Sequence, residues 1–180
     1  FYSISNCQEG LSRVTLGNFL IKRVVFEIQE ELPNIKHFGT LSPIPGFRDW
    51  FSYLEDGKIK NILGDVPVEN ISFLKSPDLK VGDPRIVSNK VAITKLVAHY
   101  LMNEKDKKKL PINDVCRFHL GNGAIIDDII INANVSEVGL NRSFGVMVNY
   151  LYELKNIEKN HEEYINNKTI IVSDKLKKII

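Results

Sequence analysis

Segments with the residue spacing of strands alternate along this chain with segments spaced like helices. Strand patterns are found at residues 1–5, 37–41, 124–133 and 143–152. Helical spacing is found from Asn18, as the N-cap, to Pro33, and again at residues 87–103, 112–120 and 156–166. Residues 56–85 have no sustained period and are expected to form a long irregular excursion. The alternation predicts an α/β layered domain rather than a helix bundle.

The composition excludes several classes of protein. At 180 residues, with 43% hydrophobic and 26% charged residues, the chain has the size and balance of one globular domain. No apolar run reaches the roughly 18 residues that a membrane span needs. A net charge of +2 is too small to favour a nucleic-acid partner. Two cysteines, Cys7 and Cys116, are too few for a disulfide framework, which favours a reducing intracellular compartment.

The loop between the first predicted strand and the first predicted helix has the features of an anion site. Residues 6–17 include two glycines and lead into a helix N-terminus, whose free N–H groups attract phosphates. Arg13, Lys22 and Arg23 lie around the helix start, while glutamates lie toward its end, opposite to the order that the helix dipole favours. A bound anion would explain this order, and a solvated helix with scattered charges is the alternative. No Gly-Lys-Ser/Thr sequence supports nucleotide hydrolysis.

Ser42 precedes a loop of restricted conformation. Two prolines in the sequence SPIPG limit the backbone, so the Ser42 hydroxyl is expected to point in one direction at the edge of the sheet. A simple turn-forming serine is the alternative, and no GxSxG elbow is present.

His119 is the one histidine of four that stands at a glycine-rich helix end, in FHLGNG. Its imidazole can give or take a proton near neutral pH, although a structural cap is the alternative. No His or Cys pair has metal-ligand spacing, and Asp127 and Asp128 are expected on opposite faces of a strand. We therefore expect no metal site.

Five sequence blocks carry a resemblance to a known family: FYSISNCQEGL, LGNFLIKRVV, LSPIPGF, FHLGNGA and VMVNYLY. Their order and spacing resemble the catalytic half of malonyl-CoA decarboxylases from Phe1 to about Tyr164. The resemblance implies a fold like that of GCN5-related N-acetyltransferases, with a mixed central sheet. It also implies that the CoA pyrophosphate binds the loop entering the central helix.

The resemblance also implies an activity and a site. Malonyl-CoA would lose CO2 to give acetyl-CoA, without a cofactor or metal beyond the CoA of the substrate. Ser42 would engage the malonyl carboxylate, His119 would donate the proton to the enolate, and Tyr152 would lie near them. The matching malonyl-CoA-binding loop consists of Ser12, Arg13, Val14, Thr15, Leu16, Gly17 and Asn18.

Some residues depart from the family pattern. Thr15 stands where many members have an acidic residue, and Ile130, Ile131 and Asn134 stand where Asn-Trp and then Asp are usual. These departures are expected to change the shape and polarity of the acyl pocket.

Residues 1–180 are expected to be part of a longer enzyme of fatty acid metabolism, because Phe1 is not a Met and the family has an upstream helical domain and earlier strands. Without those strands the sheet would have an unpaired edge. A homo-oligomer is expected for the full-length protein. The compartment would be cytoplasmic or mitochondrial, because the final residues, KKII, are not the Ser-Lys-Leu peroxisomal signal.

Two other function classes remain open. An acyl-CoA N-acyltransferase would share the fold and the CoA loop, although the SPIPG and FHLGNGA blocks argue against it. A non-catalytic CoA-binding or interaction module would keep the loop without turnover.

Overall fold

The computed structural model describes residues 16–180, and side chains from Ile21 onward. Three strands form one antiparallel sheet in the order β1-β3-β2. The strands are β1 (Phe38–Pro43), β2 (Ile125–Ile130) and β3 (Met147–Tyr152). The central strand β3 therefore pairs with both of the others, and β1 is an edge strand among the described residues.

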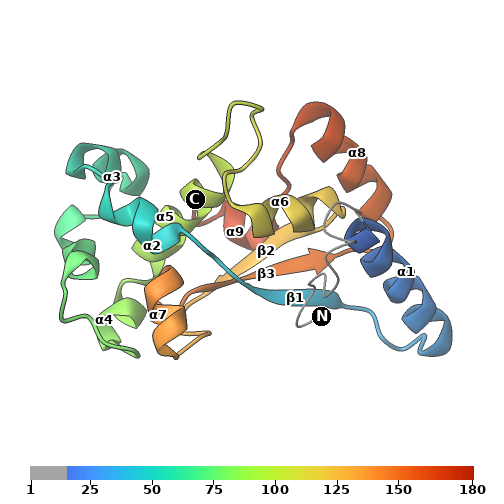
Figure 1. Cartoon of the computed structure of the whole chain (residues 1–180), viewed down its shortest axis with the longest axis horizontal. Helices are drawn as coiled ribbons and strands as arrows, with labels where there is room; N and C mark the ends of the chain where they lie inside the picture. Colours follow the sequence, from blue (N-terminus) through green and yellow to red (C-terminus); the bar gives the residue numbers. More distant parts are fainter. Residues whose placement is uncertain (1–15) are drawn as a thin grey trace.

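Helices surround this sheet. Figure 1 shows α2 to α5 and α7 gathered toward one end of it, and α1 and α8 at the other end. The helices are α1 (Leu16–Glu31), α2 (Phe47–Ser52), α3 (Asp56–Leu63), the 3-10 helix η2 (Val68–Lys75), α4 (Pro84–Ser88), α5 (Lys90–Met102), α6 (Asp114–Gly121), α7 (Glu137–Ser143), α8 (Ile157–Asn167) and α9 (Asp174–Lys177).

Side chains alternate along the sheet between a buried and a more exposed face. On β3, Val148, Tyr150 and Tyr152 are buried and the residues between them are half-buried. On β1, Thr40 and Ser42 are buried while Leu41 is exposed. Since Ser42 is paired with Val148 and Thr40 with Tyr150, these side chains share the buried face.

The predicted α/β layering is confirmed, and several element boundaries differ from the prediction. Helix α1 begins at Leu16, so Asn18 lies inside its first turn rather than at the N-cap. Strand β1 extends through Pro43, which places Ser42 within the strand, while Ser143 belongs to α7 and not to β3. Residues 56–85 are only partly irregular, because they contain α3, η2 and the start of α4. Each of these helices has at most eight residues, too few for a sustained apolar period.

Among the described residues the sheet is antiparallel, and the mixed central sheet that the resemblance implied stays a prediction. Both ladders between its strands are antiparallel. A single parallel bridge between Ile126 and Val172 adds the segment before α9 beside β2. A bulge between Ile126 and Asp128 leaves Asp127 out of the ladder, which interrupts the simple alternation expected for the two aspartates.

No helix within residues 16–180 is both long and apolar enough to cross a bilayer. The predicted strand at residues 1–5 and the loop up to Thr15 lie outside the described residues.

Gly123 allows helix α6 to end against α8. Its φ is +80°, and a Cβ atom there would lie 2.1 Å from the carbonyl oxygen of Ile157. We expect Gly123→Ala to lower the free energy of unfolding by more than about 2 kcal/mol, because both the backbone strain and the clash oppose it. Urea unfolding measures this change.

Gly57→Ala is the matched control, because no atom lies within 4 Å of the added methyl group and Gly57 is helical. That variant should be no less stable than the parent. Equal stability of the Gly123 and Gly57 variants would contradict the packing of α6 against α8.

Candidate active site

Strand β1 places Ser42 on the buried face of the sheet. Ser42 is 6% exposed, and its Oγ lies 3.0 Å from the Oγ1 of Thr40. The prediction of a serine held at the sheet edge by a proline-rich loop agrees with this position.

The loop that follows Ser42 is held by hydrogen bonds to its backbone. The carbonyl oxygen of Pro45 accepts from the Tyr100 hydroxyl at 3.0 Å and from the Asn113 Nδ2 at 2.9 Å. Gly46 has a φ of +80°, and a Cβ there would lie 2.9 Å from the Tyr100 hydroxyl oxygen. The loop conformation is therefore fixed by α5 and by the residue before α6, as well as by its prolines.

Helix α6 places His119 above the buried face of the sheet. Asn113 is its N-cap and accepts a hydrogen bond from the Cys116 backbone N–H at 2.8 Å. The helix ends at Gly121, with Asn122 as C-cap and Gly123 in the left-handed region, as the glycine pattern predicted. The half-buried His161 of α8 lies with its Nδ1 2.6 Å from the Gly121 carbonyl oxygen.

Ser42, His119 and Tyr152 form one continuous chain of hydrogen bonds. The Oγ of Ser42 lies 3.0 Å from the Nε2 of His119. The Nδ1 of the same ring lies 2.8 Å from the Tyr152 hydroxyl oxygen. His119 therefore contacts both Ser42 and Tyr152 directly, although the three residues come from β1, α6 and β3.

The site is almost fully buried, and burial determines its protonation. His119 is 4% exposed and Tyr152 is 1% exposed. Burial lowers the pKa of His119 from 6.5 to about 4, and it raises the pKa of the Tyr152 phenol. The imidazole is therefore neutral near pH 7, with one N–H to share between its two partners.

Tyr150 is a further residue that holds the imidazole, and it was not predicted. Its ring stacks on that of His119, with centroids 4.3 Å apart and an interplanar angle of 21°. Burial raises the pKa of Tyr150 well above its usual value and that of the neighbouring Cys116 to about 12. The alternation in VNYLY was the available signal, since it places Tyr150 and Tyr152 on one face.

The predicted CoA-binding loop is only partly within the described chain. Ser12, Arg13, Val14 and Thr15 lie outside the described residues, and Leu16, Gly17 and Asn18 begin helix α1.

Two cations of the predicted anion site already have carboxylate partners. The Nζ of Lys22 lies 3.1 Å from Glu158 of α8, and the Nε of Arg23 lies 2.6 Å from Glu27. Lys22 thus helps to join α1 to α8, a role that its sequence position did not indicate.

A family model described as the malonyl-CoA decarboxylase C-terminal domain matches residues 1–180. The chain belongs to this family. Mitochondrial malonyl-CoA decarboxylase from Rattus norvegicus is 36% identical over 198 residues, covering 100% of this chain and 40% of the relative. The corresponding protein from Anser anser anser is 37% identical over 194 residues, covering 98% and 38%.

Solved structures agree with the malonyl-CoA decarboxylase assignment. The enzyme from Rhodopseudomonas palustris superposes with a TM-score of 0.87 at 39% identity, covering 99% of this chain and 41% of that chain. The enzyme from Cupriavidus metallidurans gives a TM-score of 0.82 at 36% identity, covering 100% and 47%. The chain thus spans less than half of the length of these relatives.

The residues that depart from the malonyl-CoA decarboxylase pattern follow β2 or end it. Ile130 of β2 pairs with Met147 of β3. The next residue of β3, Val148, pairs with Ser42 of β1. Ile131 packs against the core. The Oδ1 of Asn134 accepts from the Ser136 hydroxyl at 2.7 Å, so Asn134 shapes the turn that leads into α7.

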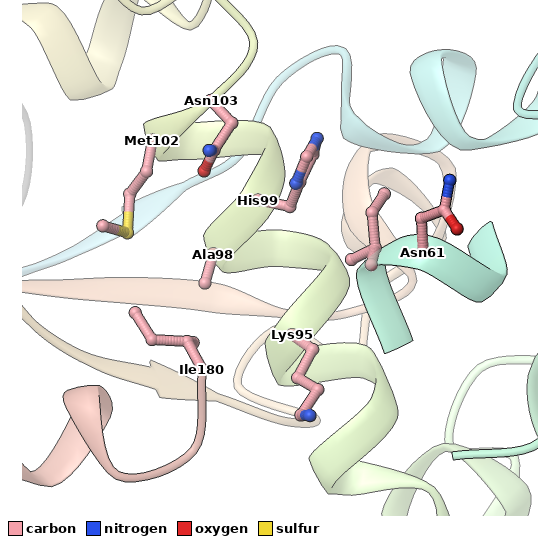
Figure 2. A pocket seen from close by; sticks show the side chains of 8 residues that line it. Asn61, Lys95, Ala98, His99, Met102, Asn103 and Ile180 are labelled. Carbon is pink, nitrogen blue, oxygen red and sulfur yellow. The ribbon is translucent and has the colours of Figure 1, made fainter. Parts of the chain in front are cut away.

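Of two larger pockets, only one has a wall formed by a predicted site residue. A cavity of about 730 Å³ is lined by Tyr152 together with Lys36, His37 and Lys155. Another, of about 290 Å³, lies between α3, α5 and the last residue, and Figure 2 shows His99 and Lys95 on its wall. No residue of the hydrogen-bond chain lines that second pocket.

Within the described residues there is no group of three or more His, Cys, Asp or Glu side chains placed to hold a metal ion. Asp128 instead forms an ion pair with Lys175. The expectation that no metal or separate cofactor takes part stays a prediction.

The lowered pKa of His119 predicts a pH-dependent stability. Between pH 6.5 and about 4 the unfolded chain binds a proton at this residue that the folded chain does not bind. Lowering the pH through this window should therefore remove up to about 3 kcal/mol of unfolding free energy in the parent. The His119→Asn variant should lose less unfolding free energy over the same pH window. Urea unfolding at several pH values measures this loss.

His37→Asn is the control for this measurement, since His37 is exposed. It should keep the pH dependence of the parent. An equal loss of stability in the parent and in His119→Asn would contradict a buried, neutral His119.

Proposed function

We propose that this chain decarboxylates malonyl-CoA to acetyl-CoA and CO2, with Ser42 and His119 as its catalytic residues. The observation that carries the proposal is the 3.0 Å contact between the Ser42 Oγ and the His119 Nε2 on a buried sheet face. The family assignment and the names of the relatives support the same reaction.

The reaction requires a group that engages the carboxylate and an acid that protonates carbon. When the bond between the carboxylate and the methylene carbon breaks, its electron pair forms a thioester enolate, and CO2 leaves. A hydroxyl can donate a hydrogen bond to the carboxylate and orient it, which is the role proposed for Ser42. The enolate carbon then takes a proton to give acetyl-CoA, and His119 is the nearest titratable partner of Ser42.

The surroundings of His119 suit the role of an acid that acts only when substrate is present. Burial lowers its pKa in the free protein. A negative carboxylate brought against Ser42 raises the pKa of the ring, and the imidazolium then forms. Its Nδ1–H donates to the Tyr152 hydroxyl oxygen, so the Nε2–H is the proton delivered to carbon. Solvent replaces that proton after each turnover.

Tyr152 is proposed to determine which ring nitrogen faces Ser42. Its hydroxyl lies 2.8 Å from Nδ1 and comes from β3, the central strand of the sheet. A fixed partner at Nδ1 keeps Nε2 directed toward Ser42 throughout the reaction.

The finer features implied by the family resemblance belong to the same proposal. The loop from Ser12 to Asn18 would bind the CoA moiety at the start of α1. The fold would correspond to that of GCN5-related N-acetyltransferases. The full-length protein would be a homo-oligomer, with no cofactor besides the CoA of its substrate.

Release of CO2 from malonyl-CoA tests the proposal directly. Ser42→Ala and His119→Asn should each lower kcat by about 100-fold or more, the usual contribution of general acid catalysis. Ser52→Ala makes the same chemical change as Ser42→Ala at an exposed position and should keep full activity. The assay is run with and without an amine acceptor.

Three outcomes would contradict the proposal. CO2 release that is undiminished in both site variants would exclude the assigned roles. Transfer of the acyl group to the amine would indicate an N-acyltransferase. Binding of malonyl-CoA by the parent without any CO2 release would indicate a non-catalytic CoA-binding module.

A further inference from the structure

Thr40 is a fourth member of the hydrogen-bond chain in the site. It lies two residues before Ser42 on the same face of β1, and it is 5% exposed. The distance from its Oγ1 to the Ser42 Oγ is 3.0 Å, equal to that from Ser42 to His119. Thr40 is also the cross-strand partner of Tyr150, whose ring stacks on His119. It therefore contacts the site through both Ser42 and the strand that supports the imidazole.

The number of hydrogens in this chain restricts what Ser42 can do. A serine hydroxyl has one hydrogen to donate and lone pairs to accept with. Ser42 has two polar neighbours, so if it donates to one of them it accepts from the other. A carboxylate bound to Ser42 is only an acceptor, so Ser42 must then donate to it. In that state both Thr40 and the Nε2–H of His119 have to donate to the Ser42 oxygen.

We propose that Thr40 is a positioning residue, which donates its hydroxyl hydrogen to Ser42 and so keeps the Ser42 hydrogen available for the carboxylate of malonyl-CoA. This role rests on the proposed function of Ser42. In the free protein the same arrangement has Thr40 donating to Ser42, Ser42 donating to Nε2, and the Nδ1–H of His119 donating to Tyr152. When the carboxylate binds, the Ser42 hydrogen turns toward it and His119 takes up a proton from solvent at Nε2, so that the Nε2–H donates to the Ser42 oxygen in place of accepting from it.

In this role Thr40 contributes to the binding of the malonyl carboxylate and not to the binding of the rest of the ligand. Malonyl-CoA and acetyl-CoA differ only by that group, so loss of the Thr40 hydroxyl should affect the first ligand and not the second. A general packing defect on β1 would weaken both ligands together. The ratio of the two affinities therefore separates a positioning role from a structural one.

The experiment compares Kd values for malonyl-CoA and acetyl-CoA by calorimetry, in brief titrations on ice. Thr40→Val removes the hydroxyl with little change of shape and should weaken malonyl-CoA about 3- to 10-fold, the usual effect of one hydrogen bond. Its affinity for acetyl-CoA should stay that of the parent. Thr40→Ser keeps a hydroxyl and should restore the affinity for malonyl-CoA.

Thr94→Val is the matched control. Thr94 is buried on α5, and its hydroxyl has no hydrogen-bond partner among the residues that the structure covers. This variant makes the same chemical change in the core and should bind both ligands as the parent does. Equal weakening of both ligands in Thr40→Val, or no weakening of malonyl-CoA, would overturn the proposal.

A second measurement distinguishes failure of this inference from failure of the proposed function, because it needs no substrate. In protein with ¹⁵N-labelled histidine, the imidazole shifts of His119 report its tautomer. The parent and Thr94→Val should show the Nδ1–H form, and Thr40→Val should show a larger share of the Nε2–H form. If the parent releases no CO2, this shift still supports Thr40 as the donor to Ser42. An unchanged tautomer in Thr40→Val overturns that role even in an active enzyme.

Discussion

The carbonyl oxygen of Pro45 connects the part of the site on strand β1, which contains Ser42, with the part on helix α6, which contains His119. It accepts hydrogen bonds from Tyr100 on α5 and from Asn113 at the start of α6. Asn113 at the same time caps α6 through the Cys116 backbone N–H. The end of strand β1 and the beginning of helix α6 are therefore joined through one side chain. Since Ser42 belongs to that strand and His119 to that helix, their 3.0 Å contact depends on this junction.

Burial gives the site its chemical character. An imidazole in water would be partly charged near neutral pH, whereas His119 has a pKa lowered to about 4 and stacks on the ring of Tyr150. The partners of the neutral ring, Ser42 and Tyr152, are already in place. The site therefore needs little rearrangement when a negatively charged substrate binds. Under the proposed function the substrate itself supplies the charge that makes His119 an acid, which ties proton delivery to the presence of a carboxylate.

Residue patterns along the chain were sufficient to predict the α/β layering and the position of His119 at the end of a helix that glycines terminate, because spacing and capping are local properties. The family resemblance was needed to group Ser42, His119 and Tyr152, since 77 positions separate the first two and only tertiary packing joins them. The pairing of Lys22 with Glu158, 136 positions away, was hidden for the same reason. Short helices such as α4 and α9 contain too few residues for a periodic signal. The roles of Thr40 and Asn113 follow from hydrogen-bond partners that no local pattern specifies.

The most direct test of the account is a crystal structure of the chain with a malonyl-CoA analogue in which a sulfonate replaces the leaving carboxylate. The account predicts a sulfonate oxygen within hydrogen-bonding distance of the Ser42 Oγ, with the Nε2 of His119 facing the adjacent methylene carbon. It also predicts that Tyr152 keeps its contact with Nδ1. A sulfonate bound away from Ser42, with the methylene carbon facing no ring nitrogen, would contradict the assignment of Ser42 and His119 as the residues that perform the reaction.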